Sequence, residues 1–251
     1  MLKNSISPMN SVSSKKILVV TEGLKDEPTV FRKLSEIFGL ASNVEIVPYG
    51  TNIHQLIAAL EKEVDLEDVD IQLLLREIAR KSSKAQSEIE KLNDTYTDKI
   101  FIFDIEIQDP NYYENETKIL KLLEAMNDST SDLGKLFINY PMWESYFIRN
   151  PAILYFENFS KRGAFKEYAH KSVEWRLYNK NKLDDNSYKS LLKAQATRYE
   201  AVLRREYDAD SGLDLFRLQT ENIKENKIAI INTSVLFFVD YLGKEKVLKA
   251  I

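Results

Sequence analysis

Two short apolar runs constrain the fold of this chain most. Residues 17–21 read Ile-Leu-Val-Val-Thr, and residues 99–107 read Lys-Ile-Phe-Ile-Phe-Asp-Ile-Glu-Ile. A short run that is apolar at nearly every position is typical of a parallel strand covered on both faces. Parallel strands need crossover connections, which are usually helices. The chain is therefore predicted to alternate strands with helices.

Residues 15–150 carry that alternation. Further strands are expected over 44–48 and 135–139. Helices are expected where apolar side chains recur at helical spacing. These helical segments are 27–38, the stretch from Ile53 to Leu60 behind a cap at Thr51 or Asn52, 65–82, 117–126 and one that begins over 141–147. The predicted fold class is α/β, with a central parallel sheet flanked by helices.

After residue 150 the pattern becomes mostly helical. The segment 227–242 is strongly apolar, and it is either a final buried helix or a strand followed by a helix. We favour mostly helix. The other helical segments are 168–179, 187–205 and 213–223. The predicted organisation is a flexible N-terminal arm at 1–15, a catalytic α/β domain at 16–150 and a helical C-terminal extension at 151–251.

Composition excludes several kinds of site. The chain has no cysteine, so disulfides, thiolate zinc sites and cysteine nucleophiles are excluded. It has only two histidines, His54 and His170, and neither is expected to be a metal ligand. No apolar run approaches the ~20 residues of a membrane-spanning helix, and the polar, Ser-rich start resembles no signal peptide. A cytoplasmic location without membrane contact is expected.

Acidic side chains follow two of the predicted strands. Glu22 comes directly after the first strand, Asp104, Glu106 and Asp109 end the later one, and Glu27 begins the next helix. Ligands of open α/β sheets bind beyond the carboxyl ends of the strands. Residues 104 and 106 are expected to point to one face of an extended segment. An acid after a strand is also common as a helix cap, but two such sets together favour a site for Mg²⁺ or Mn²⁺.

Three segments resemble the motifs of a known family. Residues 19–31 (VVTEGLKDEPTVF) are similar to the first TOPRIM motif, in the form found in RloB-like and AbiL-like phage-defence proteins. Residues 101–109 (FIFDIEIQD) resemble the second motif, usually D-x-D, and residues 137–147 (FINYPMWESYF) resemble the segment that follows it. Order and spacing agree over about residues 15–150. The resemblance extends to effector nucleases of the overcoming-lysogenization-defect and PARIS systems.

The resemblance implies a TOPRIM-like fold and Mg²⁺-dependent cleavage of DNA or RNA. Glu22 matches the family's glutamate, a metal ligand or general acid/base. Asp104 and Glu106 match the two metal-binding acids, and Glu27 the second acid of the first motif. Glu144 matches a later acid and is a possible site residue. The chain departs from the family at Glu106, where Asp is usual, at Asp26, where Thr is usual, and at Tyr140, which intrudes into the last motif.

The expected catalytic residues are therefore Glu22, Glu27, Asp104 and Glu106, with Asp109 as an additional metal ligand. The partners that the resemblance implies are a nucleic acid, DNA or tRNA or another RNA, and an ABC-type ATPase. The chain has no G-x-x-x-x-G-K-[ST] loop, so any ATPase must be a separate chain. A homo-oligomer is possible. Two alternatives stay open: an effector or regulatory subunit that is inactive without its ATPase, and a non-catalytic phosphate-binding α/β domain.

Basic and aromatic residues interleave in the C-terminal region. Such a pattern can follow a phosphate backbone and stack on bases. A solvated helical face with tyrosines in the core also explains this pattern, and we favour that interpretation over nucleic-acid binding. The residues include Arg162, Lys166, Lys171, Arg176, Tyr168, Trp175 and Tyr178.

Overall fold

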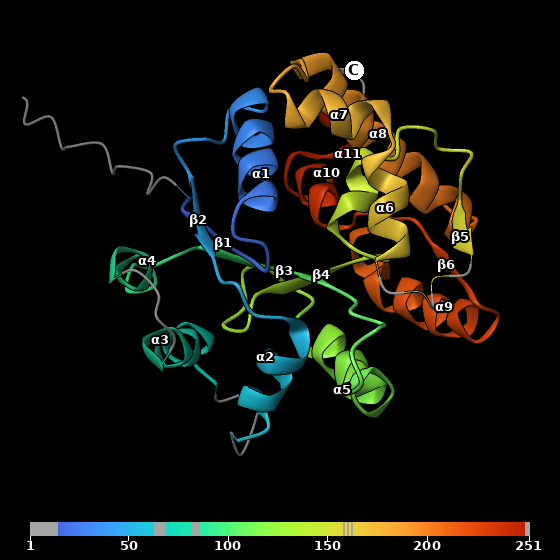
Figure 1. Cartoon of the computed structure of the whole chain (residues 1–251). Helices are drawn as coiled ribbons and strands as arrows, with labels where there is room; N and C mark the ends of the chain where they lie inside the picture. The colour runs from blue at the N-terminus through green and yellow to red at the C-terminus, as the bar shows by residue number, and fades with distance from the viewer. Residues whose placement is uncertain are drawn as a thin grey trace, which may run out of the picture.

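Four parallel strands form the centre of the computed structural model, in the order β2-β1-β3-β4. Thr21 pairs with Ile102 and Asp104 pairs with Asn139, so the strands end at one shared carboxyl edge (Figure 1). The strands are β1 (Ile17–Thr21), β2 (Val44–Pro48), β3 (Asp98–Asp104) and β4 (Lys135–Asn139). The predicted α/β class with a parallel sheet is confirmed.

The structure describes residues 15–62, 69–81, 86–157, 159, 161 and 163–248. The predicted N-terminal arm therefore lies outside the described residues, except for residue 15. The first residues of the helix predicted over 65–82 also lie outside them.

Helices cover both faces of the sheet. Figure 1 shows α2, α3 and α5 on one face and α1 on the other, where C-terminal helices join it. Each helix buries an apolar stripe against the strands, which is how an α/β layer excludes water. The bounds are α1 (Asp26–Ile37), α2 (Ile53–Leu60), α3 (Ile71–Lys81), α4 (Gln86–Lys91) and α5 (Tyr112–Ala125).

The C-terminal region is mostly helical, as predicted, with a small antiparallel pair of strands, β5 and β6. Its elements are η1 (Trp143–Phe147), β5 (Tyr155–Glu157), α6 (Ala164–His170), α7 (Val173–Asn179), α8 (Asp185–Leu203), η2 (Ala209–Ser211), α9 (Gly212–Lys224), β6 (Lys227–Ala229), η3 (Ser234–Leu236), α10 (Phe237–Leu242) and α11 (Lys244–Leu248). The three η elements are 3₁₀ helices.

Several predicted boundaries were wrong. The segment 227–242 is a strand followed by helices rather than mostly helix, because β6 is buried and has no alternating pattern to reveal it. The segment 168–179 is two helices, because the Ser172 hydroxyl accepts from the Trp175 backbone N–H and begins α7. The segment that starts at Pro141 forms a 3₁₀ helix, and α5 begins at Tyr112 rather than residue 117.

One hydrophobic core joins the sheet to the C-terminal region. Phe31 of α1 packs on Phe237 and Phe238, with ring centroids 5.6 and 4.9 Å apart. Offset aromatic pairs of this kind add stability beyond the area they bury. The C-terminal region is therefore packed against the α/β part, while the domain boundary at residue 150 stays a prediction.

A buried arginine fixes the chain that follows η1. The Arg198 guanidinium donates to the carbonyl oxygens of Ile148 at 2.6 Å, Asn150 at 3.1 Å and Ile230 at 3.0 Å, and to the Gln195 side chain at 2.9 Å. A buried guanidinium needs acceptors for its donors, and three backbone carbonyls and the Gln195 side chain supply them for Nη1 and Nη2, while Nε has no partner among the described residues. These bonds hold α8, β6 and the end of η1 in one arrangement.

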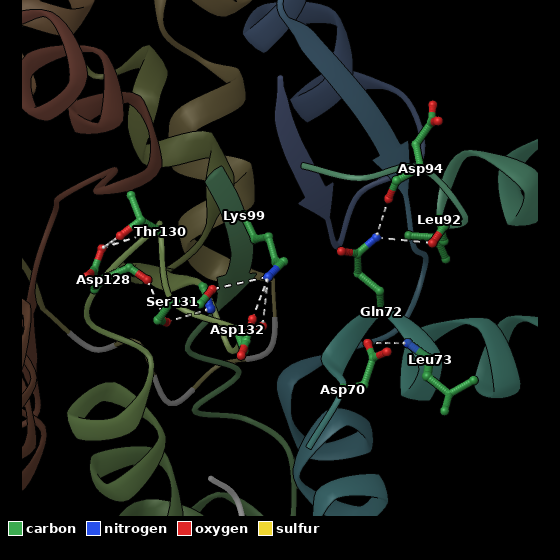
Figure 2. A network of polar contacts seen from close by, with 11 residues as sticks. Asp70, Gln72, Leu73, Leu92, Asp94, Lys99, Asp128, Thr130, Ser131 and Asp132 are labelled. Atoms are coloured by element: carbon green, nitrogen blue, oxygen red, sulfur yellow. Dashed lines mark hydrogen bonds and ion pairs between the residues drawn. The ribbon is translucent and has the colours of Figure 1, made fainter. Parts of the chain in front are cut away.

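The amino edge of the sheet is closed by paired polar groups. The Lys99 ammonium donates to the carbonyls of Ser131 and Asp132, each at 3.2 Å, and the Gln72 amide donates to the carbonyls of Leu92 and Asp94 at 3.1 and 3.0 Å (Figure 2). A polar cavity of about 490 Å³ lies beside these residues. The Lys99 bonds tie the start of β3 to the loop before β4, and the Gln72 bonds tie α3 to the loop before β3, so this edge is a structural junction.

Gly134, just before β4, is expected to tolerate no side chain. Its φ is +74°, and a β-carbon there would lie 2.7 Å from the Lys99 backbone oxygen and β-carbon. Gly134→Ala should lower the free energy of unfolding by about 2 kcal/mol or more, since left-handed backbone and overpacking each cost about 1–3 kcal/mol. Urea unfolding followed by circular dichroism measures the change.

Gly212→Ala is the matched control. Gly212 has helical φ of −57° and open space around its α-carbon, so an alanine there should leave stability unchanged or raise it slightly. Equal losses from the two substitutions would contradict the account of Gly134.

Candidate metal centre

Three acids meet at the carboxyl edge of the sheet. Glu22 directly follows β1, Asp104 is the last residue of β3, and Glu106 lies in the turn after it. Each offers a carboxylate oxygen, and these oxygens all lie within 4.8 Å of one another. We call these residues the carboxylate triad. In the described part of the chain, no other group of three His, Asp or Glu side chains has this spacing.

Glu106 reaches the triad in a different way from that predicted. The strand was expected to continue to residue 107, but β3 ends at Asp104. Glu106 has a φ of +50°, in the left-handed region that residues other than glycine rarely adopt. Its carbonyl accepts from the Asp109 N–H at 2.9 Å. A turn, not strand alternation, therefore brings its carboxylate toward Glu22, and such strain is common at functional sites.

Backbone and amide donors position the other two members of the triad. The Asp104 N–H donates to Glu22 Oε2 at 3.1 Å, and the Glu22 N–H continues the ladder by donating to the Ile102 carbonyl at 3.0 Å. Asn139, at the end of β4, donates its amide to Asp104 Oδ1 at 3.3 Å. Three neighbouring strand ends thus hold the triad, so its geometry follows from the strand order.

Two further acids are buried beside the triad. Glu27, in the first turn of α1, is 4% exposed and accepts from the Gly23 N–H at 2.9 Å. Glu144 of η1 is 7% exposed, and its charge raises the pKa values of both Glu27 and Asp104. We call the triad together with Glu27 and Glu144 the acidic cluster.

Asp109, predicted as an additional ligand, lies outside the triad. Its Oδ1 accepts from the N–H and the side-chain amide of Asn111 at 2.8 and 2.9 Å. This arrangement is an Asx turn at the start of α5. Asp109 therefore has a local structural partner in this structure.

Burial and mutual repulsion raise the pKa values of Glu22, Glu27 and Asp104. Burial is the largest cause for Glu22, whose pKa rises to about 8, with the charges of Glu106 and Glu27 adding to it. Burial likewise raises the pKa of Glu27 to about 8, and the charge of Glu144 raises it further. The pKa of Asp104 is raised well above its usual value by burial and by Glu22. Carboxylates placed this way favour either protons or a cation.

Helices of the C-terminal region complete the site. The Lys166 ammonium lies 3.0 Å from Glu144 Oε1, and His170 Nε2 lies 3.7 Å from the same oxygen. The His170 ring stacks on Trp175 with centroids 4.0 Å apart. Tyr178 of α7 donates to Asp26 Oδ1 at 3.0 Å. These contacts join α6 to η1 and α7 to the start of α1.

The sequence did not predict that Asn139 and His170 lie at this site. Lys166 stood only within a basic and aromatic stretch whose favoured interpretation was a solvated face. Its spacing of four from His170 on α6 was the available signal, because residues four apart share a helix face. Nothing in the sequence indicated that this face meets Glu144.

Comparisons with protein-family models, with curated proteins and with solved structures found no match. Of the helices in the described residues, none is long and apolar enough to cross a membrane. The chain has an α/β fold with a carboxylate triad that could bind a divalent metal ion.

Without metal, stability should fall as the pH rises. The pKa values of Glu22 and Glu27 are about 8 in the folded chain against 4.5 for a free glutamate. Between these values the folded chain holds more protons than the unfolded chain. The stabilisation is complete below about pH 4.5 and is lost as the pH rises toward about 8. Thermal melts of metal-free protein across this range measure the loss.

Glu27→Gln should flatten this pH dependence and raise the melting temperature of metal-free protein near pH 8. The control is Glu114→Gln, which removes the same charge from an exposed position in the first turn of α5. That variant should keep the wild-type slope. A slope unchanged in Glu27→Gln would contradict the electrostatic account.

Proposed function

We propose that this chain is a metal-dependent nuclease that cleaves phosphodiester bonds of DNA or RNA at the acidic cluster. The observation that carries the proposal is the carboxylate triad, with its oxygens within 4.8 Å at the carboxyl edge of the sheet. Hard divalent ions such as Mg²⁺ and Mn²⁺ prefer oxygen ligands. A bound ion would also offset the mutual repulsion of these carboxylates.

The position of each acid in the cluster suggests its role in metal binding or catalysis. Asp104 and Glu106 hold the ion, and Glu22 either holds it or activates the nucleophile. Glu27 and Glu144 contribute to a second ion. When bound, such an ion supplies polarisation of the phosphate, stabilisation of the leaving oxygen and a water of lowered pKa. The chain itself supplies the fixed geometry, through the Asp104 N–H bond to Glu22 and the Asn139 bond to Asp104.

The resemblance of three segments to TOPRIM motifs supports the step from metal centre to nuclease. The segments 19–31, 101–109 and 137–147 supply the acidic cluster in chain order. The same resemblance supports a role as the effector of an anti-phage, abortive-infection system in the cytoplasm, working with a separate ABC-type ATPase. Co-purification of an ATPase with the tagged chain, expressed from its own locus, tests that partner.

A cleavage panel tests the nuclease proposal. Wild-type protein with Mg²⁺ or Mn²⁺ should cleave at least one of plasmid, single-stranded DNA and tRNA, and chelation should abolish the cleavage. Glu22→Gln should lower the rate at least about 100-fold, as the loss of an electrostatic group in a reaction centre commonly does. Gel analysis of timed samples measures the rates.

Glu114→Gln serves again as the control, because it makes the same chemical change outside the acidic cluster. It should cleave at the wild-type rate. Full activity in Glu22→Gln, or activity that persists in chelator, would overturn the proposal. If the isolated chain does not cleave nucleic acid and a co-purified ATPase restores cleavage, the effector-subunit alternative is favoured.

A further inference from the structure

Only one lysine or arginine contacts the acidic cluster within the described residues. Lys166 Nζ lies 3.0 Å from Glu144 Oε1, and no other ion pair with Lys or Arg joins the five acids. The charge of Asp104 also raises the pKa of Lys166, after that of Glu144, so the ammonium is within electrostatic reach of the triad. A single cation thus faces the centre where a metal would bind.

The two partners differ in exposure. The Glu144 side chain is 9% exposed, whereas the Lys166 side chain is 56% exposed. The ammonium therefore lies at the boundary between the buried acids and solvent. An exposed lysine pair alone contributes little to stability, because ordering the side chain and screening by water offset the attraction. A role in binding explains this placement better than a role in folding.

A phosphodiester must approach this centre against negative charge. The acidic cluster holds five carboxyl groups, so one divalent ion leaves it short of neutrality when most are ionised. A polyanion therefore needs a positive group at the entrance. Lys166 is the group that the fold supplies there, and Glu144 orients it.

His170 also lies beside Glu144. It lies four residues after Lys166, on the same face of α6, with Nε2 3.7 Å from Glu144 Oε1. Its ring is stacked flat on Trp175, with an interplanar angle of 9°. At this distance His170 Nε2 makes no hydrogen bond to Glu144, so Lys166 is the residue of α6 that pairs directly with the Glu144 carboxylate.

We propose that Lys166 binds a non-bridging phosphate oxygen of the nucleic acid at the metal centre. The inference rests on the proposed function and identifies the residue of the C-terminal region that contacts substrate. It also gives the packing of α6 against η1 a functional reason: among the described residues, α6 supplies the one Lys or Arg ion pair to the acidic cluster.

Removing the charge of Lys166 should move two affinities in opposite directions. In Lys166→Met, Mn²⁺ should bind a few-fold more tightly, because a competing cation is gone. A labelled short single-stranded DNA should bind about 10-fold more weakly or worse, since a charge-assisted hydrogen bond contributes about 1.5–3 kcal/mol. Calorimetry measures the first affinity. Fluorescence anisotropy, in Ca²⁺ to slow turnover, measures the second.

Two further variants separate binding from folding. Lys166→Arg keeps the charge and should retain most of the DNA affinity. Lys171→Met removes an exposed lysine just after α6 that has no ion pair with the acidic cluster, and it should have a much smaller effect. The salt dependence is a further readout: the slope of log affinity against log salt should shrink by about 0.7 in Lys166→Met, the value for one lost contact to a single strand.

The outcomes distinguish this inference from the proposed function. If wild-type protein binds Mn²⁺ but Lys166→Met binds DNA with wild-type affinity and slope, the inference fails and the metal centre stands. If both affinities fall together in Lys166→Met, the residue is structural and the inference also fails. If wild-type protein binds no Mn²⁺, the proposed function and the inference fall together.

Discussion

The repulsion among carboxylates at the carboxyl edge is the constraint on which the rest of this structure depends. The sheet order places the ends of β1, β3 and β4 side by side, and each carries a polar residue of the site: Glu22, Asp104 and Asn139. Backbone N–H groups hold the acids in place but do not neutralise them. Burial and, after it, the charges of neighbouring acids raise the pKa values of Glu22 and Glu27 to about 8, so the site favours protons or a cation.

The C-terminal region helps to build the same site. Its aromatic residues share the core of α1, Arg198 fixes the chain after η1, and α6 and α7 contact the acid-bearing segments. The fold thus gathers acids at the carboxyl edge of the parallel sheet, with Glu27 of α1 and Glu144 of η1 beside them, and places a cation on α6. This division explains how a chain with a net charge of −4 can still present positive charge where a phosphate would arrive.

The sequence was sufficient for the sheet and for part of the site. The continuous apolar runs of β1 and β4 gave their bounds directly, and acids after such strands must meet at one edge. The approach of Glu106 was predicted for the wrong reason, because a left-handed turn cannot be told from a continuing strand by residue type alone. Lys166 and His170 could not be placed, since their contact with Glu144 depends on how α6 packs on η1, a long-range contact without a local signal.

The most direct test of the central claim is a crystal of this protein soaked in Mn²⁺, with the anomalous scattering of the ion mapped. The account predicts an anomalous peak among the carboxylates of Glu22, Asp104 and Glu106, at distances near the ~2.1 Å expected of small hard divalent ions on oxygen. An ordered triad without a peak, in crystals where Mn²⁺ occupies other acidic positions, would contradict the account.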